Sequence, residues 1–289
     1  MLFKKKLPKL FNIKSETIDF LKFKLGLSSL EARTEYEILM ENLFGFSSKD
    51  LELKILEEVN IEKVNKLKEI LNLRLEGKPL AYINNTAHFF SLKFYVDENV
   101  LIPRPESETL IEIVIKNLKN KDNIKILEIG TGSGCLSITL LKFLGEKINK
   151  IIATDISQKA LDIAYKNACT HKIQDKIEFI KADLVNQELE QQNFDFLISN
   201  PPYIASKNYD NLQKEVKQEP FEALCGSKEN IDGKLYYKRI FDLNLKVKHL
   251  LFETDPEIIE DIANLFLMRY KEIKIHKDLN NLERFLECK

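Results

Sequence analysis

Four consecutive residues, Asn200-Pro201-Pro202-Tyr203, place an amide side chain, two prolines and a phenol at the end of an apolar stretch. Proline fixes the backbone and has no N–H, so this loop presents hydrogen-bond acceptors with little mobility. The Asn200 side-chain oxygen and the Pro201 carbonyl can accept hydrogen bonds from both N–H groups of an amide or amino nitrogen. Tyr203 can pack over such a planar group. Drawn toward tetrahedral geometry, that nitrogen would direct its lone pair at an electrophilic methyl group. The alternative is a rigid turn without chemistry.

A glycine-rich turn, Gly130-Thr131-Gly132-Ser133-Gly134, lies between a predicted strand and a predicted helix. Glycine suits such a turn because it tolerates unusual dihedral angles and lets a ligand approach the backbone. The spacing G-x-G-x-G differs from the G-x-G-x-x-G of dinucleotide binders, and no Gly-Lys-Ser/Thr follows. NAD is therefore disfavoured and a Walker loop is excluded. A tight packing turn is the alternative.

Two acidic residues at the ends of later predicted strands fit a nucleoside ligand. Asp155 closes the strand after the glycine turn, where a carboxylate can accept both hydroxyls of a ribose. The alternative is a helix N-cap, formed by Asp155 or by Ser157. Asp183, followed by Leu184, can meet the exocyclic amine of an adenine, although a plain turn or cap explains it as well.

The elements that position these motifs alternate between strands and helices. We expect strands at 124–129, 150–153, 176–181, 194–199, 248–253 and 273–276. We expect helices at 135–144, 157–171, 231–247 and near 256–270. This alternation predicts a mostly parallel sheet with helices on both faces. Ligands of such sheets bind beyond the carboxyl ends of the strands, where all three motifs fall.

The chain before this region has a different pattern. Apolar residues at helical spacing predict helices over 29–44 and 51–75, and both charge signs alternate between them, which indicates a small bundle with solvated faces. A nucleic-acid-binding set of helices is the alternative. Residues 89–102 predict a β-hairpin with its turn at 97–99, and 107–120 predicts a further helix.

Composition excludes several classes of protein. The 44 Lys and Arg balance 45 Asp and Glu, so a global electrostatic grip on nucleic acid is disfavoured. No apolar run approaches the length of a membrane span, and Lys4, Lys5 and Lys6 precede no signal core. No C-x-x-C pair occurs, so we expect reduced thiols in the cytoplasm at Cys135, Cys169, Cys225 and Cys288. No metal site is expected from the scattered His88, His171, His249 and His276.

The order of the three motifs, with Glu128 before the glycine turn, resembles S-adenosylmethionine-dependent methyltransferases that act on a planar nitrogen. Three further stretches resemble the linker of the peptide chain release factor glutamine methyltransferases, the HemK-like family: 77–83, 89–94 and 100–108. The resemblance runs from about Glu31 to the end of the chain. Its specific part is Ile102-Pro103-Arg104-Pro105-Glu106 together with Asn-Pro-Pro-Tyr, because nucleic-acid methyltransferases share only the latter.

The resemblance implies an α/β fold. A seven-stranded Rossmann-like S-adenosylmethionine-dependent methyltransferase domain at 106–289 would follow a helical substrate-recognition domain at 1–83 and a β-hairpin linker at 84–105. It implies S-adenosylmethionine binding by Gly130, Thr131, Gly132, Ser133, Gly134, Asp155, Asp183, Leu184 and Asn200. It implies that the target glutamine meets Phe89, Asn200, Pro201, Pro202 and Tyr203, of which Asn200, Pro201 and Tyr203 are catalytic.

The function implied is methyl transfer to the side-chain nitrogen (N5) of a glutamine in release factors, the proteins of translation termination. An adenine- or guanine-amino methyltransferase acting on DNA or RNA is the alternative, because the same loop would serve an exocyclic amine. The balanced charge, the lack of an added target-recognition segment and the linker with Arg104 disfavour it. A helical adaptor with an inactive fold is a third interpretation, and the intact Gly130, Asp155 and Asn200 argue against it.

Some positions depart from the family pattern. Leu184 stands where many relatives have an aromatic residue, and Ser107 replaces a threonine. Residues 225–233 form a longer segment with fewer glycines, and Glu253 is followed by Thr254 instead of a glycine. We expect these last departures to affect the C-terminal edge of the sheet and not the Asn200 loop.

Overall fold

The computed structural model describes residues 8–119 and 121–289, which form two compact units that divide after Asn84. The lysines at positions 4 to 6 and the last residue of the helix expected at 107–120 lie outside the described residues. Among the described residues, no helix is both long and apolar enough to cross a membrane.

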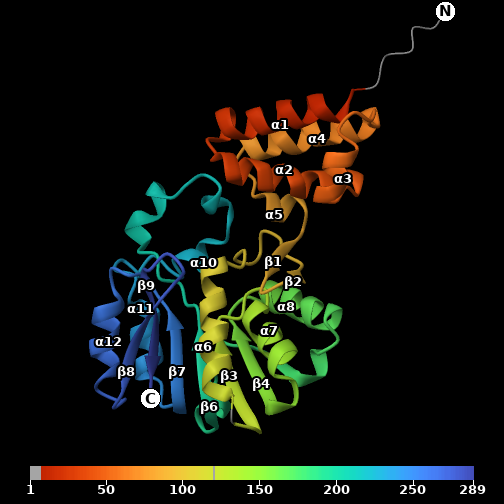
Figure 1. Cartoon of the computed structure of the whole chain (residues 1–289). Coiled ribbons are helices and arrows are strands. Elements are labelled where there is room, and N and C mark those ends of the chain that lie inside the picture. Colours follow the sequence, from red (N-terminus) through yellow and green to blue (C-terminus); the bar gives the residue numbers. More distant parts are fainter. Residues whose placement is uncertain (1–7, 120) are drawn as a thin grey trace, which may run out of the picture. The chain divides into compact units, whose positions relative to one another are not determined.

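The first unit is a helical bundle (Figure 1), as expected from its apolar spacing. Its helices are α1 (Leu10–Leu25), α2 (Ser29–Phe44), α3 (Ser48–Leu53), α4 (Ile61–Leu75) and α5 (Leu80–Ile83). Ser28 begins α2 with a capping box, in which its side chain accepts from Glu31 N and the Glu31 side chain accepts from Ser28 N. Inside the bundle, Arg74 makes a two-pronged ion pair with Glu35 at 2.7 and 3.0 Å, so both buried charges are compensated.

The helical stretch predicted at 51–75 is wrong, because it is two helices separated by a turn. Leu10 N donates to Glu57 O and Phe11 N to Ile55 O, so this turn pairs with the start of α1. The Asn60 side chain then accepts from Glu62 N and begins α4. The apolar residues between the two helices are spaced along the sequence as in a helix, although their backbone is not helical.

The hairpin lies earlier than predicted. Strands β1 (Ala87–Phe89) and β2 (Leu92–Phe94) pair around Phe90 and Ser91, and residues 95–102 form no strand. Phe90 and Ser91 have φ of 49° and 61°, a turn that normally requires glycine or asparagine. The Glu108 carboxylate helps to hold it by accepting from Phe90 N at 2.7 Å. This long-range contact has no local sequence signal.

The second unit contains a seven-stranded sheet in the order β5-β4-β3-β6-β7-β9-β8 (Figure 1). Strands β3 to β7 are parallel, and β9 is antiparallel to both of its neighbours. The strands are β3 (Ile124–Ile129), β4 (Ile148–Asp155), β5 (Ile177–Lys181), β6 (Asn193–Ser199), β7 (Lys246–Glu253), β8 (Ile273–Lys277) and β9 (Glu283–Cys288). The chain passes from β3 outward to β5 and returns to β6 beside β3, and this reversal opens a ligand crevice at the strand ends.

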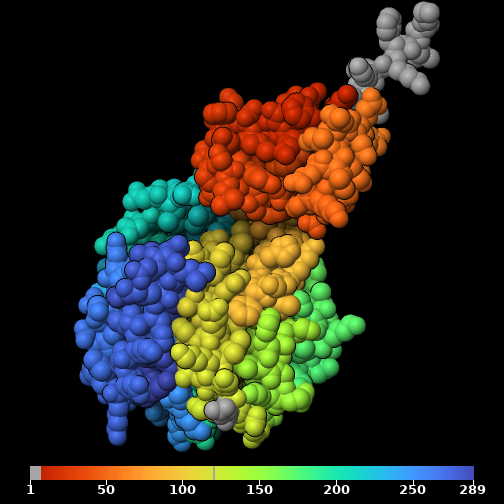
Figure 2. Space-filling view, in the orientation of Figure 1, coloured from red at the N-terminus to blue at the C-terminus, as the bar shows by residue number. Residues whose placement is uncertain are grey.

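Helices cover both faces of this sheet. The unit's α-helices are α6 (Glu108–Leu118), α7 (Cys135–Leu144), α8 (Gln158–Thr170), α9 (Gln187–Glu190), α10 (Phe221–Leu224), α11 (Leu235–Asp242) and α12 (Ile259–Phe266). One core contains Ile126 on β3 with side chains of α6 and α7, and the other contains Leu127 with side chains of α11 and α12. In the space-filling view, the yellow surface of α6 lies between the green and blue parts of the unit (Figure 2). The predicted α/β fold class is confirmed.

Two elements near the C-terminus differ from expectation. The helix predicted at 231–247 spans only α11, because the chain enters β7 at Lys246. Strand β9, which was not predicted, contains a buried Glu287 that interrupts its apolar pattern. Glu287 is compensated by His276 and Lys289, each at 2.8 Å, and these contacts hold its pKa at about 2. The sheet edge is therefore complete despite its departures from the family pattern.

Candidate active site

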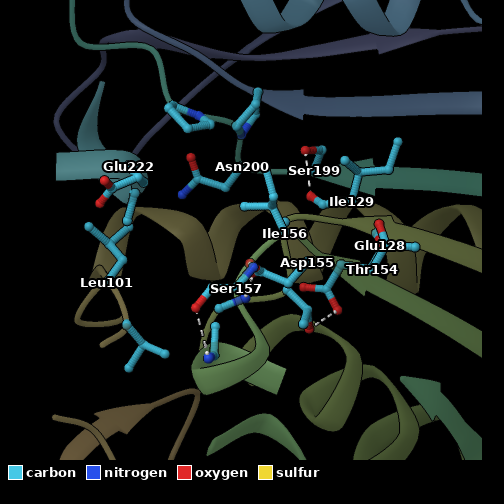
Figure 3. A pocket seen from close by; sticks show the side chains of 18 of the residues that line it. Leu101, Glu128, Ile129, Thr154, Asp155, Ile156, Ser157, Ser199, Asn200 and Glu222 are labelled. Atoms are coloured by element: carbon cyan, nitrogen blue, oxygen red, sulfur yellow. Dashed lines mark hydrogen bonds between the residues drawn. The ribbon is translucent and has the colours of Figure 1, made fainter. Parts of the chain in front are cut away.

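A cavity of about 440 Å³ lies at the carboxyl ends of β3, β4 and β6 (Figure 3). Most of the predicted site residues line it: Gly130, Thr131, Gly132, Ser133, Asp155, Asp183, Leu184, Asn200, Pro201 and Pro202. Gly134, Phe89 and Tyr203 do not belong to its lining. The topology explains this gathering, because each motif follows a different parallel strand and all these strands end at the same edge.

The glycine turn has the geometry that its sequence predicts. Gly130, Gly132 and Gly134 have φ of 74°, 54° and 80°, all in the left-handed region. A Cβ at Gly130 or Gly132 would meet no atom within 4 Å, whereas one at Gly134 would lie 3.1 Å from the Ala164 Cβ. The first two glycines thus leave space at the cavity wall, and the third lets α7 pack against α8.

Asp155 at the end of β4 holds the backbone around it. Its Oδ2 accepts from Gly132 N and its Oδ1 from Ser157 N, both at 2.9 Å. Ser157, not Asp155, is the N-cap of α8, because its side chain accepts from Ala160 N. A carboxylate has about four acceptor sites, so Asp155 can hold this turn and still accept hydroxyl groups from a ligand.

Asp183 has a partner that the sequence did not indicate. Arg239 on α11 donates to its Oδ2 at 2.9 Å, so an adenine amine would share this carboxylate with a guanidinium. Leu184 beside it has a φ of 67°, and its carbonyl accepts from the Thr154 hydroxyl at 2.6 Å. This hydrogen bond fixes the unusual backbone that places Leu184 in the cavity wall.

Glu128 contributes a buried carboxyl group to the cavity wall. Its Oε2 accepts from the Thr131 hydroxyl at 2.9 Å and from the Ser137 hydroxyl. Its Oε1 is buried and has no hydrogen-bond partner among the described residues. Burial raises the pKa of Glu128 to about 7. A buried acceptor without a partner is costly, so this atom suits a ligand that brings a donor or a positive charge.

Asn200 lines the cavity just after β6, and a chain of hydrogen bonds holds its amide. Asn200 Nδ2 donates to Ser107 Oγ at 3.3 Å, and Ser107 Oγ donates to Glu253 Oε2 at 2.5 Å. The Tyr203 hydroxyl donates to Glu253 Oε1 at 3.3 Å. Burial raises the pKa of Glu253, which lies at the end of β7 beside β6.

The loop after Asn200 is braced by residues 225–233. Asn230 is fully buried and donates to the carbonyls of Pro202 and Cys225 at 3.1 and 3.0 Å. A Cβ at Gly233 would lie 2.4 Å from the Tyr203 carbonyl oxygen, so only glycine fits there. This segment therefore supports the Asn200 loop, through contacts that the sequence did not predict.

Two predicted substrate residues lie away from the cavity lining. Phe89 is only 1% exposed and packs edge-on against Phe94 in the core. Tyr203 packs against the other core cluster, and burial raises the pKa of its hydroxyl. Tyr203 still touches the network that holds Asn200. The contact of Phe89 with a target side chain gains no support from the cavity and stays a prediction.

The linker is tied to the chain after the Asn200 loop by Glu219. Its Oε1 accepts from Arg104 at 2.5 Å and its Oε2 from Ile102 N at 3.0 Å. Arg104, Pro103 and Pro220 line the cavity, so this ion pair fixes two sides of the opening relative to each other. Arg239, Asn230 and the pair Ser107 and Glu253 were not predicted to act at the site.

Two family models match the chain. Residues 108–225 match the methyltransferase small domain, and residues 22–84 match the PrmC N-terminal domain. The chain is 34% identical over 272 residues to the release factor glutamine methyltransferase of Chlorobaculum tepidum, covering 89% of this chain and 90% of that protein. It is 43% identical over 209 residues to that of Dictyoglomus turgidum, covering 71% and 72%.

Solved structures share the fold at low sequence identity. The hMettl16 catalytic domain in complex with a 3'UTR hairpin has a TM-score of 0.56 and 15% identity, covering 68% of this chain and 74% of that chain. Such a similarity supports the architecture of the sheet and its helices and says nothing about the substrate.

Proposed function

This chain belongs to the release factor glutamine methyltransferase family, and on that premise we propose that it methylates the N5 of a glutamine in a peptide chain release factor. The methyl donor is S-adenosylmethionine. The family and the enzyme class predicted from the sequence are confirmed by the relatives and by the matched methyltransferase domain.

One observation carries the assignment of the site: Asn200 and Pro201 line the same cavity as the glycine turn and Asp155. Bound S-adenosylmethionine supplies a methyl group on a positively charged sulfur. The Asn200 oxygen and the Pro201 carbonyl then accept hydrogen bonds from the two N–H groups of the glutamine amide. These bonds hold the amide nitrogen in line with the methyl group. Catalysis by this chain is mainly positioning and preorganised electrostatics. The methylated nitrogen is acidic enough to lose its proton to water, so no strong base is needed.

The cofactor residues are also part of the proposal. The open side of Gly130 and Gly132 gives the cofactor access to the backbone, and Asp155 keeps acceptor capacity for ribose hydroxyls. The unpartnered Glu128 Oε1 suits the positive end of the amino acid portion. Asp183 and Leu184 line the wall expected for adenine. These features support the fit of S-adenosylmethionine to this cavity.

We assign recognition of the release factor to the helical unit before Asn84. This unit has its own hydrophobic core and a balanced set of charges. Among its described residues, three large apolar side chains are more than 70% exposed, which suits contact with a protein: Phe23 (77%), Leu30 (75%) and Leu53 (74%). A chain that begins near Gly77 should bind the cofactor normally but lose methylation of an intact release factor. Normal methylation by that truncated chain would contradict this role.

The decisive experiment is incubation of the full chain with labelled S-adenosylmethionine and candidate release factors, followed by mapping of the modified residue. We expect label on the side chain of one glutamine. Label on DNA or RNA, with binding that weakens steeply as salt rises, would instead support the nucleic-acid alternative.

A cytoplasmic location remains part of the proposal. The four cysteines are all unpaired, and two of them, Cys225 and Cys288, are buried, as suits a reducing compartment. Fractionation of cells that express the tagged chain would test it.

A further inference from the structure

Four side chains from distant parts of the sequence form one hydrogen-bonded chain behind the Asn200 amide: Asn200, Ser107, Glu253 and Tyr203. Ser199 and Phe252 are paired across β6 and β7, so Asn200, which follows β6, lies beside Glu253, the last residue of β7. Ser107 lies between them and is buried, as is Glu253. Ser107 and Asn200 also line the cavity, so the Glu253 end of this network is buried while the Asn200 end faces the cavity.

The directions of these hydrogen bonds follow from the chemistry of the groups. The hydroxyls of Ser107 and Tyr203 both donate to Glu253, whose carboxylate oxygens accept. Ser107 has a single hydroxyl proton and donates it to Glu253, so its oxygen can only accept a hydrogen bond from Asn200. Asn200 therefore turns its Nδ2 toward Ser107 at 3.3 Å, and its Oδ1 points the other way.

The surroundings of Glu253 act on its ionisation in both directions, and the net effect is a raised pKa. Burial raises its pKa, and the nearby Glu106 adds to this rise. The hydroxyls of Ser107 and Tyr203 and the charge of Arg284 oppose it. The Tyr237 hydroxyl donates to the Glu253 backbone carbonyl at 2.7 Å and so fixes the end of β7. The carboxylate thus has a fixed position and two hydroxyl donors.

We propose that Glu253 and Ser107 are positioning residues that fix the orientation of the Asn200 amide, so that its oxygen and not its nitrogen faces the target. This rests on the proposed function, in which that oxygen accepts an N–H of glutamine. The fixed oxygen also sets specificity: it favours an amide, which donates, over a carboxylate, which would place two acceptors against each other.

The first test is turnover of the full chain with saturating S-adenosylmethionine and release factor. Ser107→Ala frees the Asn200 amide to turn, so we expect turnover to fall on the order of 10²-fold, as for loss of a preorganised partner. The dissociation constant for S-adenosylmethionine should change by less than about threefold. Ser107→Thr, which keeps the hydroxyl, should restore most of the turnover.

A matched control is Thr139→Val, which removes another fully buried hydroxyl. The Thr139 Oγ1 has no hydrogen-bond partner among the described residues, and Thr139 does not line the cavity. We expect wild-type turnover from this variant. Equal losses in Thr139→Val and Ser107→Ala would show that any buried hydroxyl matters, and would overturn the proposal.

A double-mutant cycle tests whether Ser107 acts through Asn200. In an Asn200→Ala background, Ser107→Ala should cause no further loss of turnover, because the amide that it orients is gone. Independent losses that multiply would overturn the proposal. This readout separates orientation of one amide from a general effect on the fold, which would persist in that background.

The last measurement is inhibition by a release factor whose target glutamine is replaced by glutamate. The measured quantity is the preference of the protein for the glutamine form of the release factor over the glutamate form. This preference should be at least about tenfold larger for the wild-type protein than for Ser107→Ala. An unchanged preference, or wild-type turnover by Ser107→Ala, overturns the orientation while leaving the proposed function intact. Absence of release factor methylation by the wild-type chain would instead overturn the proposed function itself.

Discussion

At the glycine end of the cavity the polar groups belong mainly to the backbone, whereas at the Asn200 end they belong to side chains. Gly130 N and Thr131 N both donate to the Thr154 carbonyl, and Gly132 N donates to Asp155. At the other end, one amide depends on Ser107 and Glu253, which are far from it in sequence. A backbone site tolerates most side-chain changes outside its glycines, while a side-chain network fails when one member is lost.

The largest effect should come from Asn200 itself. Asn200→Ala removes the acceptor for the target nitrogen but leaves the loop braced by Asn230 and Gly233. We expect turnover to fall on the order of 10²–10³-fold with the fold retained. The measurement is the rate of release factor methylation, with the melting temperature as a control. A folded variant with the wild-type rate would show that the chemistry lies elsewhere.

Asn200→Asp tests the same end more finely. It keeps an acceptor but adds a negative charge, which stabilises a bound sulfonium more than a transition state in which the positive charge disperses. We therefore expect slow transfer with cofactor affinity retained or increased. Fast transfer by this variant would show that the charge of the acceptor is unimportant.

The two ends also differ in how well the sequence predicts them. The glycine turn and Asp155 were predicted to share one ligand site, because spacing along a βαβ unit fixes backbone geometry locally. The network behind Asn200 was not predicted, since Ser107 and Glu253 meet it only through the strand order and the start of α6. The pairing of Asp183 with Arg239 was missed for the same reason. Sequence patterns therefore predicted more of the residues that line the cavity than of the residues that hydrogen-bond to them.

The fold shows the same division. Apart from the short helix α9, which was not predicted, the strands and α-helices from β3 to β6 were predicted close to their observed bounds because hydrophobic periodicity is a local property. The hairpin turn at Phe90 and Ser91 was misplaced, because its backbone is held by Glu108 and not by turn residues. Strand β9 was missed because the buried Glu287 interrupts its apolar pattern, and the contacts with His276 and Lys289 that compensate this carboxylate have no signal in the strand itself.

At the glycine end, Asp155→Ala should weaken S-adenosylmethionine binding by about 1–3 kcal/mol, the range for hydrogen bonds to a charged group. The carboxylate also holds Gly132 N and Ser157 N, so part of this loss would come from the turn. Calorimetry gives the affinity, and turnover at saturating cofactor should stay near the wild-type rate. Unchanged affinity would leave Asp155 as a turn residue only.

Two glycine variants separate the shape of the turn from access to the cavity. Gly132→Ala and Gly134→Ala both place a side chain at positive φ, which costs about 1–2 kcal/mol of stability. Only Gly134→Ala adds contacts, at 3.1 Å to the Ala164 Cβ and the Ile138 Cδ1, so it should be the less stable variant. Only Gly132→Ala adds a methyl group at the cavity wall, so it should bind S-adenosylmethionine more weakly. Equal affinities of the two variants for S-adenosylmethionine would contradict the idea that Gly132 leaves space for the cofactor at the cavity wall.

The smallest effect concerns Glu128, whose buried Oε1 has no hydrogen-bond partner in the part of the chain that the structure describes. Its pKa is raised by burial from 4.5 to about 7 in the folded chain. A carboxyl group with a raised folded pKa stabilises the fold fully below its unfolded pKa and loses that contribution as pH rises through about 7. Without cofactor, this group should therefore lower the free energy of unfolding by about 1 kcal/mol between about pH 6 and about pH 8.

Glu128→Gln isolates this contribution, because glutamine keeps an acceptor for the Thr131 and Ser137 hydroxyls but does not ionise. Urea unfolding at the two pH values should show a shallower decline in the variant than in the wild-type chain. Other buried carboxyls, such as Glu219 and Glu253, titrate in both proteins, so the difference between the two declines belongs to Glu128. Parallel declines would show that Glu128 is ionised throughout. In that case the Glu128 carboxylate would be charged in the free protein, and the glycine end would depend on a side chain as much as the Asn200 end does.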